Sequence, residues 1–313
     1  MTPAASPIRR VAVVGAGLIG SGWAAQFLAQ GLEVSATDPA PGAEAKMRAT
    51  LARIWPVMEQ LGLKPGASPD RLHFSANLAS AVAGAEFVQE NGPERLEFKR
   101  QIFAALDALL PPEAILASST SGIMMSAIQT ACRHPGRCVV GHPFNPPYLI
   151  PLVEVVGGAQ TSEAAIDRAM AFYAGLGKVP IRLHREVKGH AANRLQAALW
   201  REAVHLVAEG VASVADIDAA VAWGPGLRWG VMGPHLVLHL AGGQGGMRHF
   251  MDHLSGPFSD WWADMGKPTL TPEVKAAIVQ GVEAEAGGRT IDQLEAERDA
   301  VITQLLALRR SRS

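Results

Sequence analysis

The sequence predicts an α/β fold followed by an all-α part, and three observations support this prediction. The segment "RRVAVVGAGLIGSGWAAQFLAQG" places a glycine-rich turn between a short apolar segment and a helical pattern. Strand and helix patterns then alternate to about residue 187, and only amphipathic helical patterns follow. Such alternation indicates a doubly wound, mostly parallel sheet. We therefore expect a Rossmann-type domain over residues 1–187 and a helical domain over residues 188–313.

Length and composition limit the class of protein. With 313 residues, 48% of them hydrophobic, the chain is long enough for two domains with cores of their own. A net charge of -1 and the lack of like-charge runs argue against nucleic acid or an anionic membrane as partner. No apolar run reaches the roughly 18 residues of a membrane span. Because Cys132 and Cys138 favour reduced thiols, we expect a cytoplasmic protein that binds small molecules.

The glycine turn near the N-terminus predicts a dinucleotide site. It follows an apolar strand, Val11 to Val14, and opens a helix that runs to about Gln30. The first glycine permits the turn, the second lets the backbone approach a pyrophosphate, and the third lets the helix pack closely on the sheet. The helix N-terminus then faces the phosphates. The expected cofactor contacts in this turn are Gly15, Gly17, Leu18, Ile19 and Gly20.

Asp38, at the end of the second predicted strand, indicates which dinucleotide binds. Its carboxylate accepts hydrogen bonds from ribose hydroxyls and repels a 2′-phosphate, so NAD is favoured over NADP. The residues after it, Pro39, Ala40 and Pro41, include no arginine to hold such a phosphate. The alternative is that Asp38 caps a helix that starts near Pro41.

The alternation continues along the chain. We expect strands at "LHFSA", "AEFVQE", "AILASS", "RCVVGH", "LVEVVG" and "KVPIRL", and helices near 41–62, 94–109, 123–131 and 162–175. The first helices of the second domain are expected at 189–210 and 214–224, and the Pro/Gly-rich pieces at 64–69 and 224–234 are expected to be loops.

Two polar residues are expected at the carboxyl ends of strands, where open α/β sheets bind their ligands. Ser121 follows the strand in "AILASS", and His142 follows "RCVVG". Pro143 favours an extended backbone at His142. The alternatives are a helix-capping role for Ser121 and a structural role for a solitary histidine.

A lone carboxylate, Glu154, lies within the apolar segment "PLVEVV". The period of two along a strand puts Leu152, Glu154 and Val156 on one face. An unpaired buried carboxylate costs several kcal/mol, so Glu154 requires a cationic or hydrogen-bonding partner. The connector "PFNPPYLIP" allows the chain to reverse, which would set Glu154 beside His142 as the acid that orients a general base. The alternative partner is an arginine from the helical domain.

Asn193 lies in the first turns of the long helical pattern at 189–210. Its amide would donate a hydrogen bond to a substrate oxygen, or, alternatively, would only satisfy backbone groups where the helix starts.

These motifs resemble those of the L-3-hydroxyacyl-CoA dehydrogenase family. The likeness runs over nearly the whole chain, through "GAGLIG", "SSTSG", "GHPFNP", "PLVEVV" and "NRL". The resemblance implies a Rossmann domain, a helical dimerisation domain, NAD as cofactor, and active-site roles for the matching Ser121, His142, Glu154 and Asn193. We also expect cofactor contacts at Glu90 and Lys99.

Other segments depart from the acyl-CoA enzymes. Where those read S-N-T-S, this chain has Ser118, Ser119, Thr120 and Ser121. The segments "QENGPERLEFKR", "LQAALWREA", "GLRW" and "GGMRHF" resemble the branch that contains carnitine and gulonate dehydrogenases and lambda-crystallin, which oxidises free 3-hydroxy acids. We therefore expect oxidation of a small free L-3-hydroxy acid. The alternatives are a short-chain 3-hydroxyacyl-CoA thioester as substrate, or a nucleotide-binding structural protein.

The helical domain offers candidates for substrate contact. Trp200 follows Asn193 by seven residues and so projects from the same helix face, and an indole attracts a quaternary ammonium group. Phe144 and Trp229 are the other expected substrate contacts, and core or interface packing is the alternative role. The apolar segment "VMGPHLVLHLAGG" predicts a homodimer. The histidine pairs 235/239 and 249/253 lack an obvious third ligand, so we expect no metal.

Overall fold

A computed structural model describes residues 8–310, and the chain divides into two units. The first unit contains the residues up to Asn193 together with those from Glu297 onward, and the second contains Arg194–Ala296. The predicted domain boundary between residues 187 and 188 stays a prediction.

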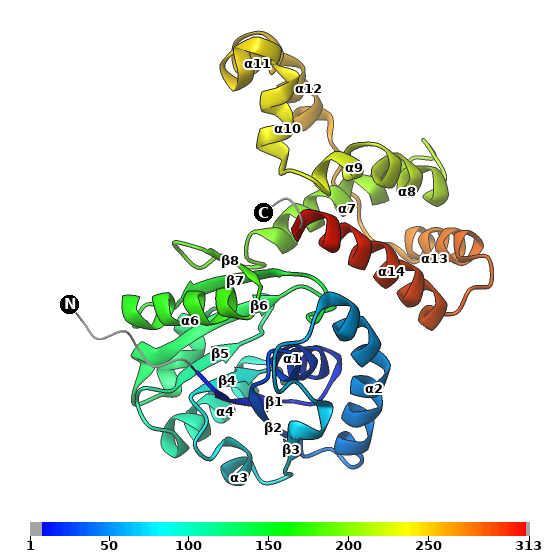
Figure 1. The fold of residues 1–313 in the computed structure, drawn as a ribbon. Coiled ribbons are helices and arrows are strands. Elements are labelled where there is room, and N and C mark those ends of the chain that lie inside the picture. The colour runs from blue at the N-terminus through cyan, green and yellow to red at the C-terminus, as the bar shows by residue number, and fades with distance from the viewer. Residues whose placement is uncertain (1–7, 311–313) are drawn as a thin grey trace. The chain divides into compact units, whose positions relative to one another are not determined.

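A single eight-stranded sheet forms the centre of the first unit in the described part of the chain (Figure 1). Its strand order is β3-β2-β1-β4-β5-β6-β7-β8, and every neighbouring pair is parallel except β6 with β7. The predicted α/β class, with a mostly parallel sheet, is therefore confirmed. The strands are β1 (Arg10–Val14), β2 (Glu33–Thr37), β3 (Leu72–Phe74), β4 (Phe87–Glu90), β5 (Ile115–Ser118), β6 (Cys138–Pro143), β7 (Leu152–Gly157) and β8 (Val179–Arg182).

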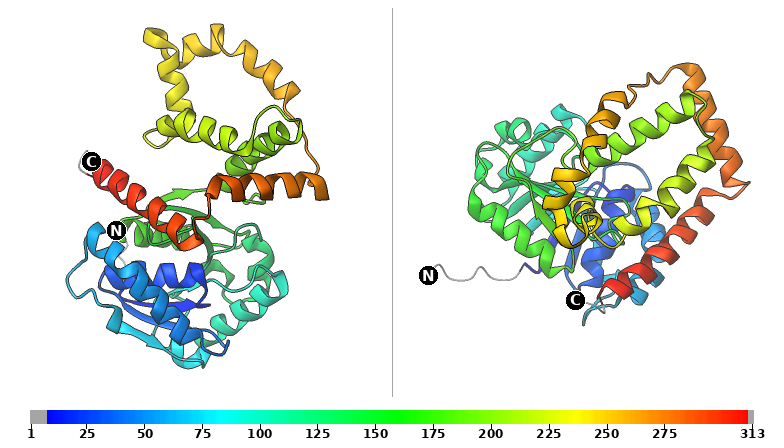
Figure 2. Two further views of the ribbon diagram at one scale, coloured as in Figure 1. Left: turned by 90° about the vertical axis from the view of Figure 1, so that its right-hand side faces the viewer. Right: turned by 90° about the horizontal axis from the view of Figure 1, so that it is seen from above.

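Helices cover both faces of this sheet, as the views in Figure 2 show. One face packs against α1, α2 and α6, and the other against α3, α4 and α5. Successive side chains of β1 point to opposite faces of the sheet. Val11 and Val13 therefore lie in one core, and Ala12 and Val14 lie in the other. The helices are α1 (Leu18–Ala29), α2 (Ala43–Leu61), α3 (Leu78–Val82), α4 (Leu96–Leu109), α5 (Met125–Ile128) and α6 (Glu163–Gly175).

The second unit is helical throughout its described residues, as expected. One prediction there was wrong: residues 224–234 are not all loop, because Pro225–Trp229 forms the short helix α9. Proline fits the first position of a helix, where its missing N–H leaves no bond unmade. The helices are α7 (Ala192–Ala208), α8 (Val214–Trp223), α9, α10 (Pro234–Ala241), α11 (Gly246–His253), α12 (Gly256–Asp264), α13 (Pro272–Ala286) and α14 (Ile291–Arg310); α7 begins and α14 ends in the first unit.

Residues 8–310 contain neither a membrane-spanning helix nor a cluster of metal-binding side chains. None of their helices is long and apolar enough to cross a membrane. No group of three or more His, Cys, Asp or Glu side chains among them is placed to hold a metal ion. Cys132 and Cys138 are free thiols whose sulfur atoms lie 3.7 Å apart. A location in the cytoplasm stays a prediction.

Candidate active site

A histidine and a glutamate face each other across β6 and β7. The antiparallel register of these strands pairs His142 directly with Glu154, and the Nδ1 to Oε2 distance is 2.9 Å. Both residues are buried, at 4% and 0% exposure. Because the carboxylate only accepts, Nδ1 carries the hydrogen and the ring's lone pair is left on Nε2. The arrangement provides a base atom with a fixed tautomer.

The second oxygen of Glu154 binds the start of α7. Its Oε1 accepts hydrogen bonds from the backbone N–H groups of Ala191 (2.8 Å) and Ala192 (2.9 Å). Burial alone would raise the pKa of Glu154, but the hydrogen bonds from His142, Ala192 and Ala191 hold that pKa below its usual value. The carboxylate therefore stays ionised and stabilises a positive charge on the imidazole.

Ser121 lies in the loop that follows β5, and Glu94 holds this loop. The Oε1 atom of Glu94 accepts hydrogen bonds from the Thr120 hydroxyl (2.6 Å) and from the backbone N–H groups of Ser121 (3.0 Å) and Gly122 (3.1 Å). Helix α5 is capped at Met124 with no side-chain hydrogen bond. Ser121 is exposed and does not cap that helix, so the alternative role considered for it finds no support here.

Asn193 belongs to the same unit as this loop. Its Nδ2 atom lies 3.5 Å from the Ser121 carbonyl oxygen, at the limit of a hydrogen bond. The structure thus brings together Ser121 with Asn193, and His142 with Glu154. Their roles in catalysis remain a proposal.

Two residues expected to contact the cofactor form a buried ion pair with each other. Lys99 and Glu90 are 1% and 0% exposed, and the Lys99 Nζ lies 2.9 and 3.0 Å from the two Glu90 carboxylate oxygens. Glu90 also accepts hydrogen bonds from the Ser118 hydroxyl (2.6 Å) and the Gly92 N–H (2.6 Å). With these partners, the pair fixes the ends of β4 and β5. A direct contact with the cofactor stays a prediction.

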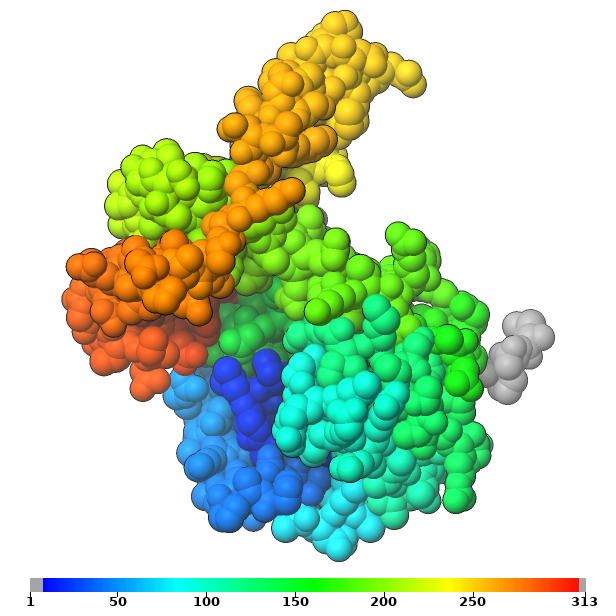
Figure 3. All heavy atoms as spheres, turned by 180° about the vertical axis from the view of Figure 1, so that it is seen from behind, coloured from blue at the N-terminus to red at the C-terminus, as the bar shows by residue number. Residues whose placement is uncertain are grey.

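The glycine turn has the geometry that a pyrophosphate requires. Gly15 has a φ of 95°, and a Cβ atom there would lie 2.8 Å from the Asn91 carbonyl oxygen. A Cβ on Gly20 would lie 1.9 Å from the Gly15 carbonyl oxygen, whereas one on Gly17 would meet nothing within 4 Å. Gly17 caps α1 without a side-chain hydrogen bond, so the first N–H groups of α1 are available to an anion. In Figure 3 the dark-blue N-terminal segment lies recessed between the light-blue and cyan segments.

Asp38, expected to bind the ribose of the cofactor, directly follows β2. Its carboxylate oxygens accept hydrogen bonds from the N–H groups of Ala16 and Ala40, each at 2.9 Å. It also lines a cavity of about 570 Å³ together with Pro41, Arg48, Phe74 and other residues. The guanidinium of Arg48 is paired with Glu44 at 2.9 Å. The residues present fit NAD.

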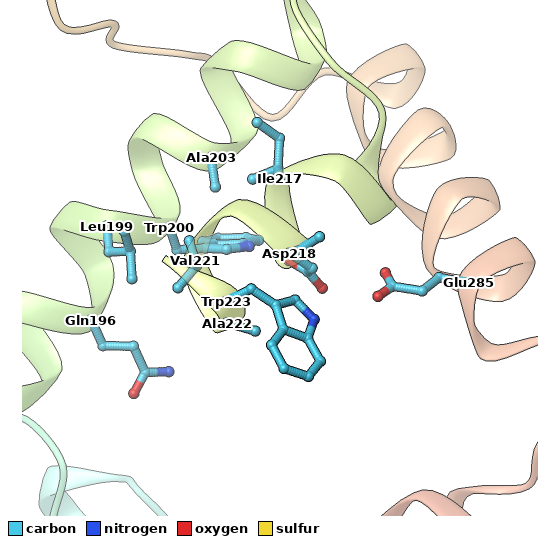
Figure 4. Close-up of a pocket in the computed structure, with 11 residues that line it drawn as sticks. Gln196, Leu199, Trp200, Ala203, Ile217, Asp218, Val221, Ala222, Trp223 and Glu285 are labelled. Carbon is cyan, nitrogen blue, oxygen red and sulfur yellow. The ribbon is translucent and has the colours of Figure 1, made fainter. Parts of the chain in front are cut away.

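The expected substrate contacts lie in both units. In the first, the ring of Phe144 meets that of His142 edge to face, with centroids 5.4 Å apart. In the second, Trp200 is 54% exposed and lines a cavity of about 560 Å³, and Trp229 is 41% exposed and does not line it. Figure 4 shows this cavity, with Trp200 on α7, Trp223 on α8 and Glu285 on α13.

Sequence reasoning missed Glu94 and His190. Glu94 lies in "QENGPER", a segment singled out only for its resemblance, and its contacts are with backbone N–H groups that a pattern does not reveal. His190 is buried beside His142, with ring centroids 5.0 Å apart. The one signal for it in the sequence is the preceding glycine, Gly189. In the structure this glycine has a positive φ of 79°.

Family profiles match most of the chain. The profile described as 3-hydroxyacyl-CoA dehydrogenase, NAD binding domain, matches residues 10–187. The profile of the 3-hydroxyacyl-CoA dehydrogenase C-terminal domain matches residues 189–272.

Curated and solved relatives agree with these profiles. The L-carnitine dehydrogenase of Streptomyces griseus is 55% identical over 96% of this chain and 89% of its own length. That of Bacillus cereus is 48% identical over 96% of this chain and 92% of its own length. A solved structure of FHMPC 5-dehydrogenase, described as an NAD+ dependent dismutase, has a TM-score of 0.82 and 31% identity, covering 97% of this chain and 98% of that one. The (S)-3-hydroxybutyryl-CoA dehydrogenase of Ralstonia eutropha has a TM-score of 0.64 and 27% identity, covering 90% and 94%.

The lowered pKa of Glu154 predicts a loss of stability in acid. A carboxylate whose pKa is lower in the folded chain stabilises the fold above its unfolded value of 4.5, and this contribution disappears as the pH falls through the folded value. Replacing Glu154 by Gln should therefore lower the free energy of unfolding by about 2 kcal/mol or more at neutral pH. Urea denaturation should show this difference shrinking below about pH 4.5.

The matched control for this prediction is Glu113→Gln, which removes an exposed carboxylate of the same unit. Its unfolding free energy should follow the wild type at every pH. A Glu154→Gln difference that stays constant between neutral and acid pH would contradict the prediction.

Proposed function

The chain belongs to the 3-hydroxyacyl-CoA dehydrogenase family of NAD-dependent 3-hydroxy dehydrogenases, and from that premise we propose that it oxidises the 3-hydroxyl of a small free L-3-hydroxy acid, carnitine-like or gulonate-like, reversibly to the 3-oxo acid. Family membership confirms the resemblance inferred from the motifs, and with it NAD as cofactor. The observation that carries the proposal is the buried His142–Glu154 pair, in which Nε2 is the free base atom. The curated relatives named L-carnitine dehydrogenase support the substrate class.

His142 is the general base of this proposal. Its Nε2 removes the proton from the substrate hydroxyl, and the ionised Glu154 stabilises the imidazolium that forms. NAD, when bound, accepts the hydride from C3. Ser121 and Asn193 position the substrate oxygen and polarise the carbonyl that develops there. In the reverse direction the imidazolium returns its proton to the oxygen.

Replacement of His142 by Gln tests the base. We expect kcat to fall about 100-fold or more, because positioned general-base catalysis contributes that much, while NADH affinity is unchanged. Initial rates and NADH fluorescence titration measure the two. His184→Gln, which changes an exposed histidine of the same unit, should match the wild type. A His142→Gln variant that retains most of its kcat would exclude His142 as the base.

Initial rates with carnitine, gulonate, 3-hydroxybutyrate and 3-hydroxybutyryl-CoA test the substrate class. A free 3-hydroxy acid should give the highest kcat/KM. A preference for the thioester would instead support the family's acyl-CoA activity, and NADH binding without any turnover would support a structural protein.

We also propose that the cavity at Trp200 favours a cationic substrate. Two indoles, Trp200 and Trp223, and two carboxylates, Asp218 and Glu285, line it within the second unit (Figure 4). Aromatic faces and carboxylates both attract a quaternary ammonium group. This arrangement fits the trimethylammonium group of carnitine better than it fits gulonate. Phe144 and Trp229 are proposed as further substrate contacts.

Replacement of Trp200 by Leu tests this cavity. The KM for carnitine should rise roughly 2-fold to 30-fold, the range that a cation–aromatic contact contributes, and the KM for 3-hydroxybutyrate, which has no ammonium group, should change little. Trp261→Leu, which removes an exposed indole that does not line the cavity, is the control. Equal effects on both substrates would leave Trp200 as a packing residue.

A homodimer is the proposed assembly. The second unit exposes large apolar side chains on several helices, among them Leu236 (53%), Leu240 (61%) and Trp262 (67%). Exposed apolar surface of this kind marks association sites. Sedimentation at micromolar concentration should give a dimer, and a monomer there would exclude it.

A further inference from the structure

His190, a second histidine, lies next to the proposed base and has no role in the chemistry described above. Its ring centroid is 5.0 Å from that of His142, and it is 2% exposed. It precedes α7 with a φ of 51°, in the left-handed region that residues other than glycine rarely adopt. The same turn directs the N–H groups of Ala191 and Ala192 to Glu154. Strain at a buried residue beside a catalytic group indicates a functional constraint.

A hydrogen bond fixes which nitrogen of His190 carries the proton. Its Nε2 lies 3.0 Å from the Thr120 carbonyl oxygen. A carbonyl only accepts, so Nε2 bears the hydrogen and Nδ1 of the neutral ring holds a lone pair. Nδ1 is buried and has no hydrogen-bond partner among the described residues. A proton added there would create a buried N–H without an acceptor and a charge near His142.

The charged or titratable groups around His190 come from two strands and a loop. They are His142 on β6, Glu154 on β7 and Glu94 in the loop before α4, where Glu94 also lies 3.6 Å from Lys99. Burial lowers the pKa of His190, and a charged His142 lowers it further. The Thr120 carbonyl, Glu154 and Glu94 oppose this, but the pKa stays below its usual value of 6.5. His190 is therefore neutral at pH 7.

We propose that His190 is a positioning residue: its neutral ring ties the Thr120–Ser121 peptide to the start of α7, and its protonation limits the reduction of the 3-oxo acid at low pH. The inference rests on the proposed function, in which the protonated His142 gives its Nε2 proton to the substrate oxygen; bound NADH would supply the hydride. Reduction therefore requires a charged His142, and a second positive charge on the adjacent His190 would repel it.

Reduction of the 3-oxo acid with saturating NADH, measured from about pH 5 to about pH 9, tests the proposal. The wild type should lose kcat/KM on the acid side, below about pH 6.5. His190→Gln retains a donor for the Thr120 carbonyl and does not titrate. It should keep kcat/KM close to the wild-type value at neutral pH and hold it as the pH falls. His190→Phe removes the donor and should lose about fivefold to tenfold at every pH.

The control variant is His73→Gln, an exposed histidine on β3, which should reproduce the wild-type profile. An acid limb in His190→Gln that coincides with that of the wild type would overturn the pH part of the proposal. A His190→Phe variant as active as His190→Gln would overturn the positioning part. Equal NADH affinity in all variants, from fluorescence titration, shows that each is folded.

A readout independent of turnover separates this inference from the proposed function. Nitrogen NMR of the imidazole rings should show His190 as the neutral Nε2–H tautomer at pH 7, with protonation only below about pH 6.5. A charged ring or an Nδ1–H tautomer at pH 7 would exclude the proposal even if the enzyme is active. The expected tautomer without 3-oxo acid reduction would mean that the proposed function has failed, whereas the assignment of His190 as the neutral tie to Thr120 stands.

Discussion

The buried carboxylate of Glu154 is the group on which the arrangement of the site depends. It accepts hydrogen bonds from His142 on the neighbouring strand and from two backbone N–H groups at the start of α7. Removing the partner of a buried ionised group lowers the free energy of unfolding by about 3–5 kcal/mol. All three donors are therefore held in place. The strand pair β6–β7 and the turn before α7 are thereby fixed around one charge, and the imidazole has one tautomer.

A second buried carboxylate, that of Glu90, organises the end of β5 and the loop that follows it. Glu90 pairs with Lys99 and accepts from Ser118 at the end of β5, while the more exposed Glu94 binds the backbone of the next residues. The two networks meet at His190, which donates to the Thr120 carbonyl and touches His142. Each carboxylate accepts several hydrogen bonds, so Glu94 holds the loop of Ser121 in place and Glu154 holds the ring of His142 on β6.

The division of the chain fits a division of tasks. All four residues proposed for catalysis, and the glycine turn for the cofactor, belong to the first unit. The second unit carries the cavity with two indoles and two carboxylates, and much exposed apolar surface. In the proposed function, the first unit supplies the chemistry at the 3-hydroxyl and the cavity of the second unit recognises the rest of the substrate.

The amino-acid sequence alone predicts the features that depend on local spacing. The glycine turn, the alternation of strands and helices, and the burial of Glu154 all follow from turn geometry and from the period of two along a strand. It also predicts that Glu154 has a partner, because an unpaired buried charge costs too much free energy. It could not choose between His142 and an arginine.

The tertiary structure decided which partners meet. The β6–β7 register sets His142 opposite Glu154, a pairing that depends on how a connector of eight residues, 144–151, folds back. The contact between His190 and Thr120 spans 70 positions, and Glu94 binds loop N–H groups 27 and 28 positions away. Such contacts have no periodic signature, because they join backbone groups that every residue carries, and only the packed fold determines which of these groups lie within reach.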